Sequence, residues 1–84
     1  MADTFLLEIA TPEKLVASEQ VESAQIPGKD GYMGVLPGHA ALLSELGAGE
    51  LSYVAAGKTT RMNISGGYVE IRDNHVRVLA DSAE

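Results

Sequence analysis

YVEIRDNHVRV, residues 68–78, is the stretch of the sequence that decides the fold class. Apolar and charged side chains alternate in residues 68–72 and again in residues 76–78, with a period of two that is typical of β-strands with one buried face. Asp73-Asn74, between the two runs, supplies common turn residues. The stretch therefore predicts an antiparallel β-hairpin.

Short apolar runs and turn signals alternate along the rest of the chain as well. The further strand candidates are residues 5–9, 15–16, 21–26, 51–54 and 59–64. The turn signals between them are residues 11–14, 27–31, 56–58 and 65–67. Short strands with one apolar face are usually stabilised by packing two sheets face to face or by closing a barrel. The pattern predicts an all-β protein, and we favour a β-sandwich.

Residues 40–46, AALLSEL, are the one segment that leaves two structures open. Its composition favours helix, and Leu42, Leu43 and Leu46 have helical spacing. The flanking glycines limit it to fewer than the roughly 10 residues that a helix assignment requires, and a buried strand has the same continuous apolar character. We favour a strand, with a short helix as the alternative.

Length, charge and composition exclude several classes of protein. A chain of 84 residues is one domain at most, so we expect a single domain over residues 1–84. The net charge of −6 disfavours nucleic acid and anionic lipid as partners. No cysteine is present for a disulfide or a thiolate site, no run approaches the roughly 20 apolar residues of a membrane span, and the N-terminus lacks signal-peptide features. We expect a soluble, intracellular protein.

The sequence offers no set of residues suited to catalysis or metal binding. His39 and His75 are the only histidines, and neither has a carboxylate, hydroxyl or second imidazole at a useful spacing. Gly66-Gly67 is followed by the strand that begins at Tyr68 rather than by a helix, so a turn is favoured over a phosphate cradle. The acidic residues are dispersed singly. We predict no catalytic residue, no metal and no cofactor.

The stretch over residues 31–51 carries more apolar side chain than a loop between turns requires. Its large apolar residues are Tyr32, Met33, Leu36, Leu42, Leu43 and Leu46. We expect some of this surface to face a partner protein.

Residues 34–40, GVLPGHA, followed by Leu42-Leu43, Leu46 and Gly49, closely resemble the signature of the epsilon subunits of F-type ATP synthases. Further segments that resemble the family in the same order are residues 11–13, 65–71, 76–81 and 83–84. The resemblance covers essentially the whole chain, and such an ordered set is far more specific than a lone glycine motif.

The resemblance implies a fold and a function. The fold would be a ten-stranded β-sandwich of two sheets. The function would be that of a non-catalytic rotor subunit in the central stalk, which links the gamma subunit to the c-ring of a proton-translocating ATP synthase and so couples ion transport to ATP synthesis. The complex would hold this subunit at the cytoplasmic face of the bacterial plasma membrane, without direct insertion.

The resemblance also assigns two sets of contact residues. The loop that meets the c-ring would comprise Lys29, Asp30, Gly31 and Tyr32. The contacts with the gamma subunit would be Leu36, His39, Ala40, Leu42 and Leu43. Tyr32 stands where many relatives have an acidic residue, which leaves Asp30 as the charge partner for basic ring loops.

Family members commonly continue into a C-terminal pair of helices that can bind ATP and inhibit the enzyme. This sequence ends at Glu84, where those helices would begin, so we expect the helical domain to be absent. The alternative function is a free-standing β-sandwich that binds a small ligand. An enzyme is the third interpretation, because the constellations of a nucleophile, a base or a metal are missing.

Overall fold

The computed structural model describes residues 3–84, which form eight β-strands. The strands are β1 (Phe5–Ala10), β2 (Leu15–Val21), β3 (Ser23–Gly28), β4 (Gly31–Val35), β5 (Leu42–Glu45), β6 (Ala48–Ala55), β7 (Lys58–Arg72) and β8 (His75–Ala83). The expectation of an all-β protein is confirmed. The segment around Leu42 that left helix and strand open is a strand.

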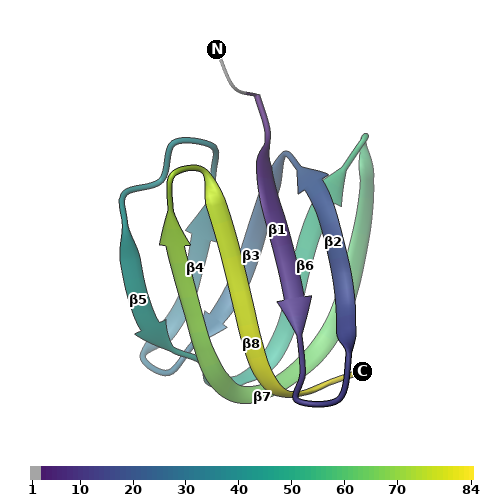
Figure 1. Cartoon of the computed structure of the whole chain (residues 1–84), viewed down its shortest axis with the longest axis vertical. Helices are drawn as coiled ribbons and strands as arrows, with labels where there is room; N and C mark the ends of the chain where they lie inside the picture. Colours follow the sequence, from purple (N-terminus) through teal and green to yellow (C-terminus); the bar gives the residue numbers. More distant parts are fainter. Residues whose placement is uncertain (1–2) are drawn as a thin grey trace.

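The eight strands form one hydrogen-bonded sheet that folds over on itself into two layers (Figure 1). The strand order is β2-β1-β8-β7-β6-β3-β4, and β5 also pairs with β7. β1 runs parallel to β8, whereas every other pair is antiparallel. In Figure 1, β1, β2, β8 and the end of β7 lie in front of β3, β4 and β6.

Strand β7 connects the two layers because it bends at Gly66-Gly67. Residues 58–65 pair with β6, and residues 68–71 pair with β5. The two glycines have φ angles of +66° and +107°, which favour glycine. A Cβ on Gly67 would lie 2.9 Å from the Ala80 Cα and would also collide with the Leu79 carbonyl oxygen of β8. The glycine pair therefore permits both the bend and the close approach of β8.

Two sequence predictions are corrected by this strand. Residues 65–67 were expected to form a turn between strands, but they lie inside β7. We also expected ten strands in two sheets. The structure has eight strands in one continuous sheet, because β7 and β8 continue through the bend together. Ser82 and Ala83 of β8 still pair with Ser65 and Ile64 after the bend.

The core lies between the two layers and is entirely hydrophobic among the described residues. The alternation expected for residues 5–9 is observed, since the side chains of Phe5, Leu7 and Ile9 are buried and those between them are half-buried. The other buried residues are Val21, Ala24, Ile26, Pro27, Val35, Leu46, Leu51, Tyr53, Ile64, Val69, Ile71, Val76, Val78 and Ala80.

Two tight hairpin turns confirm the turn predictions. Ala56-Gly57 connects β6 to β7 with φ angles of +51° and +76°, and Asp73-Asn74 connects β7 to β8 with φ angles of +51° and +61°. Positive φ at both residues is the signature of a type I′ turn, whose twist suits a two-residue hairpin.

Tyr53 joins the two layers through its hydroxyl group. The ring is 4% exposed, and the hydroxyl donates a hydrogen bond of 2.6 Å from β6 to the Glu19 Oε2 of β2. Burial, with a further contribution from Glu19, raises the pKa of Tyr53 above its ordinary value. The folded protein therefore favours the neutral phenol.

We predict that Gly67→Ala destabilises the protein far more than Gly57→Ala. Both glycines have positive φ, so both substitutions strain the backbone by about 1–2 kcal/mol. Only the Cβ at position 67 would collide with a neighbouring strand, whereas nothing lies within 4 Å of a Cβ at position 57. We expect an additional loss of at least about 2 kcal/mol for Gly67→Ala in urea unfolding. Equal losses for the two variants would contradict the account of the bend.

We predict that the stability contributed by the Tyr53 hydroxyl disappears at alkaline pH. A pKa that is higher in the folded state gives stability that is fully present below the unfolded pKa of about 10 and is lost as the pH rises through the folded value. Tyr53→Phe should therefore be less stable than the wild type at pH 8, and this difference should shrink above pH 10 in urea unfolding. A difference that stays constant across this range would contradict the prediction.

Candidate functional site

The residues assigned to partner contacts lie in two connections at opposite ends of strand β4 and in strand β5, which carries Leu42 and Leu43 (Figure 1). The hairpin between β3 and β4 carries Lys29 and Asp30, which form its turn, and Gly31 and Tyr32, which begin β4. The connection between β4 and β5 carries Leu36, His39 and Ala40. Strand β5 runs from the end of this connection back toward the β3–β4 hairpin.

The β4–β5 connection is built around a type II turn over Leu36-Pro37-Gly38-His39. The His39 amide donates to the Leu36 carbonyl oxygen at 3.2 Å. Proline suits the second position of such a turn, and the φ of +83° at Gly38 suits the third. The turn leaves the Leu36 side chain 63% exposed. The sequence PGH therefore fixes the backbone and presents a leucine to solvent.

Asn74, in the β7–β8 turn, attaches this connection to the sandwich. Its Oδ1 accepts a hydrogen bond of 2.8 Å from the Gly38 amide. Its Nδ2 donates one of 2.8 Å to the carbonyl oxygen of Thr4, just before β1. One side chain thus joins segments that are far apart in the sequence.

Strand β5 presents its leucines to solvent. The side chain of Leu43 is 71% exposed and that of Leu42 is 37% exposed. Among the residues that the structure describes, β5 pairs along one edge with β7, from Leu42–Ile71 to Glu45–Tyr68. An exposed apolar side chain costs free energy in water, so two adjacent leucines here are consistent with a covered surface in a complex.

The β3–β4 hairpin is fixed to the far end of β5 through Glu45. The Lys29 amide donates to the Glu45 carbonyl oxygen at 3.0 Å, and the Lys29 Nζ lies 3.7 Å from the Glu45 Oε2. Both side chains are more than half exposed, so the ion pair contributes little stability. Asp30 belongs to none of the ion pairs found within residues 3–84.

Tyr32 braces the same hairpin against β6. Its hydroxyl oxygen accepts a hydrogen bond of 2.9 Å from the Glu50 amide, although the residue is 58% exposed. A Cβ on Gly49 would lie 2.6 Å from this oxygen and 3.1 Å from the Pro27 Cβ. Gly49 therefore makes room for the tyrosine, which holds the Lys29-Asp30 tip in place.

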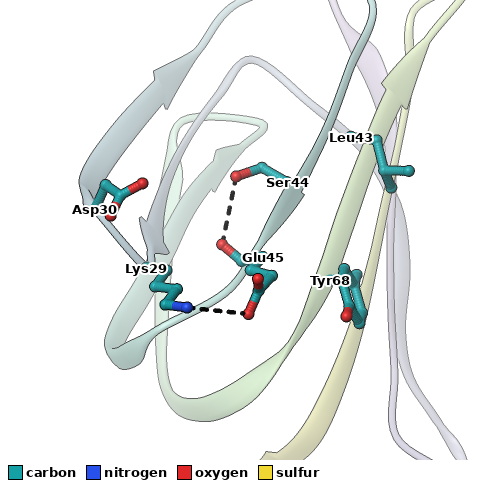
Figure 2. Close-up of a pocket in the computed structure, with 6 residues that line it drawn as sticks. All are labelled: Lys29, Asp30, Leu43, Ser44, Glu45 and Tyr68. Atoms are coloured by element: carbon teal, nitrogen blue, oxygen red, sulfur yellow. Dashed lines mark hydrogen bonds and ion pairs between the residues drawn. The ribbon is translucent and has the colours of Figure 1, made fainter.

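The structure brings some of the predicted contact residues together and separates others. Lys29, Asp30 and Leu43 line one shallow hollow, whereas Leu36 and His39 lie at the other end of the sheet. Ser44, Glu45 and Tyr68 complete the hollow (Figure 2). Sequence reasoning did not assign Ser44, Glu45 or Tyr68 to it, because they reach the hairpin only through the Lys29–Glu45 contacts and the pairing of β5 with β7.

Another apolar row crosses the outer face of the front layer beside this hollow. The register places Tyr68 opposite Leu79, Leu79 opposite Ala10, and Ala10 opposite Leu15. Tyr68, Leu79 and Leu15 are each at least half exposed. Sequence reasoning missed this row as well. The signal was visible, because a leucine lies on the face of β8 opposite to its buried residues.

Several polar side chains are bonded to one another. His75 Nε2 lies 2.6 Å from Glu8 Oε1, and Arg77 Nε lies 3.7 Å from the same oxygen. The His39 Nδ1 lies 2.7 Å from the Ala40 carbonyl oxygen. Residues 3–84 contain no group of three or more His, Asp or Glu side chains arranged to hold a metal ion, and no helix that could cross a membrane.

Comparison with known families and sequences gives one consistent match. Residues 4–84 match the family described as the ATP synthase delta/epsilon chain β-sandwich domain. The ATP synthase epsilon chain of Solibacter usitatus is 51% identical over 84 residues, 100% of this chain and 63% of that protein. The epsilon chain of Koribacter versatilis is 50% identical over 100% of this chain and 59% of its own length. The chain thus spans about three-fifths of the length of these curated relatives.

Solved structures share the fold. A chain in the cryo-EM structure of the Euglena gracilis mitochondrial ATP synthase, OSCP/F1/c-ring in rotational state 1, matches with a TM-score of 0.92 at 26% identity, over 100% of this chain and 54% of that chain. A chain in the central stalk/c-ring structure of the Tetrahymena thermophila mitochondrial ATP synthase has a TM-score of 0.77 at 15% identity, over 94% of this chain and 64% of that chain. The second match shows the fold alone.

Proposed function

The chain belongs to the β-sandwich domain family of the ATP synthase delta and epsilon chains, and from this premise we propose that it is a non-catalytic rotor subunit in the central stalk of an F-type ATP synthase. In this role it links the gamma subunit to the c-ring and so couples proton transport to ATP synthesis. The observation that carries the proposal is the placement of two different contact loops at the two ends of β4, one apolar and one charged.

The apolar surface of the β4–β5 connection and of β5 supports a contact with the gamma subunit. Leu36, Leu42 and Leu43 expose apolar area on backbone that is fixed by a type II turn and by pairing with β7. Rigid presentation of apolar side chains favours a stable interface, because little conformational entropy is lost on binding. His39 and Ala40, in the same connection, complete the gamma contact that we propose.

The charged end supports a contact with the c-ring. Lys29, Asp30, Gly31 and Tyr32 form a hairpin tip that is held by Glu45 and Glu50. Because Lys29 lies beside the Glu45 carboxylate, the Asp30 carboxylate is the charge that remains available to an external cation. We propose that Asp30 pairs with a basic loop of the ring.

The proposed location follows from the complex rather than from the chain alone. The c-ring lies in the membrane, so the subunit would be peripheral and would be held at the membrane surface through its partners. In a bacterium this surface would be the cytoplasmic face of the plasma membrane. Coupling requires only that both contacts persist during rotation, so no residue of the chain makes or breaks a covalent bond.

We predict that Leu43→Asp weakens binding to the gamma subunit at least about tenfold, because burying an unpaired carboxylate in an apolar interface is costly. Leu43 is 71% exposed, so the free protein should keep its fold and its unfolding midpoint. Thr59→Asp is the matched control, since it adds the same charge at an exposed position near the β6–β7 turn. Titration calorimetry measures both affinities. Equal affinities for the two variants would argue against the gamma assignment.

We predict that Asp30→Lys weakens the binding of the complex of gamma and this chain to the c-ring about fivefold at low salt. The difference should shrink at high salt because exposed charges are screened. Glu22→Lys makes the same charge change at an exposed position between β2 and β3, and it should leave ring binding unchanged. If both variants bind the ring equally well, the charge contact is wrong.

A further inference from the structure

We propose that Asn74 is the positioning residue that holds the Leu36–His39 turn in the conformation that binds the partner. The inference rests on the proposed contact between this turn and the gamma subunit. Asn74 is not itself assigned to that contact. It acts through the backbone of Gly38, which belongs to the β4–β5 connection.

Three segments of the chain meet at this one asparagine. Its Oδ1 accepts from the Gly38 amide at 2.8 Å, and its Nδ2 donates to the Thr4 carbonyl oxygen at 2.8 Å. Its backbone carbonyl oxygen accepts from the Leu6 amide of β1 at 3.1 Å. The β4–β5 connection, the start of β1 and the β7–β8 turn are therefore fixed relative to one another by Asn74.

The backbone and the side chain together explain why asparagine stands here. The φ of +61° is a left-handed conformation that Asn, Asp and Gly tolerate best. Of these three residues only asparagine carries both an acceptor and a donor in its side chain. Aspartate would keep the acceptor for Gly38 and lose the donor for Thr4, and glycine would lose both.

The bond to Gly38 also reinforces the type II turn that the PGH segment forms. Type I and type II turns differ by about 150° in the ψ angle of the second residue, which is a flip of the peptide between the second and third residues. In this turn that peptide joins Pro37 to Gly38, and its N–H is the group that Asn74 accepts. Pro37-Gly38 already favours a type II turn, but glycine at the third position also tolerates the flipped peptide, so the sequence alone does not exclude the other turn type. Asn74 holds the peptide in the type II orientation.

A turn that is selected in advance binds its partner more tightly than one that must reorganise. When only a fraction of molecules has the binding-competent conformation, the apparent affinity falls by that fraction. Leu36 begins the turn and His39 ends it, so a flip of the central peptide changes the surface that the proposed partner meets. Asn74 would thus act on affinity without contacting the partner.

The test compares Asn74→Gly with Asp73→Gly in the full chain. Both variants place glycine at a positive φ in the same turn, but only Asn74 has side-chain bonds to Gly38 and Thr4. We expect Asn74→Gly to accelerate hydrogen exchange of the Gly38 amide about fivefold or more and to weaken gamma binding by a similar factor. Asp73→Gly should change neither. Asn74→Asp should retain most of the Gly38 protection and most of the affinity, because the acceptor remains.

Each outcome bears on a different claim. Faster Gly38 exchange with unchanged gamma affinity would overturn the positioning role and leave the proposed function intact. A wild-type chain that does not bind gamma would overturn the proposed function and, with it, this role. If Asn74→Gly does not fold, Asn74→Asp and the wild type still test the proposal. Exchange of the Gly38 amide in the wild type at the rate of an unstructured peptide would overturn it.

Discussion

The bend of β7 at Gly66-Gly67 is the constraint on which the rest of the structure depends. This 15-residue strand pairs with β6 in one layer and with β5 in the other, and β8 follows it through the bend, so it closes the sandwich without a loop. The positive φ at both positions favours glycine, and position 67 leaves no room for a Cβ because β8 approaches the backbone of β7 at Leu79 and Ala80. A strand that stopped at Ser65 would leave β5 without the partner that holds its exposed leucines in place.

The site inherits its geometry from this arrangement. Strand β5 lies on β7, the β4–β5 connection leads into one end of β5, and the β3–β4 hairpin meets the other end at Glu45. The sandwich therefore places the PGH turn and the charged hairpin tip at opposite ends of β5, with the exposed leucines of this strand between them. The role that we propose, a subunit clamped between two partners, needs this arrangement together with rigidity, and both come from pairing within one sheet rather than from either loop alone.

The sequence predicted the elements whose signal is local. The period of two in residues 5–9 and 68–72, the turns at Ala56-Gly57 and Asp73-Asn74, and the family resemblance of the GVLPGHA signature are all confirmed. Gly66-Gly67 was wrongly interpreted as a turn, because a glycine pair has the same local signal in a turn and in a bent strand. Only the approach of β8 distinguishes the two. The side chain of Asn74 bonds to residues that lie 36 and 70 positions earlier in the sequence, so its role has no local signal either. The Lys29–Tyr32 hairpin, in contrast, was recognisable from the turn residues between Pro27 and Gly31.

The central claim is that this sandwich docks on a gamma subunit through the β4–β5 connection and β5. The most direct test is amide hydrogen exchange of the chain alone and in complex with gamma, measured residue by residue. The account predicts new protection concentrated in residues 36–45 and none at the β6–β7 turn around Ala56-Gly57. Protection at that turn with unchanged exchange in residues 36–45 would contradict it.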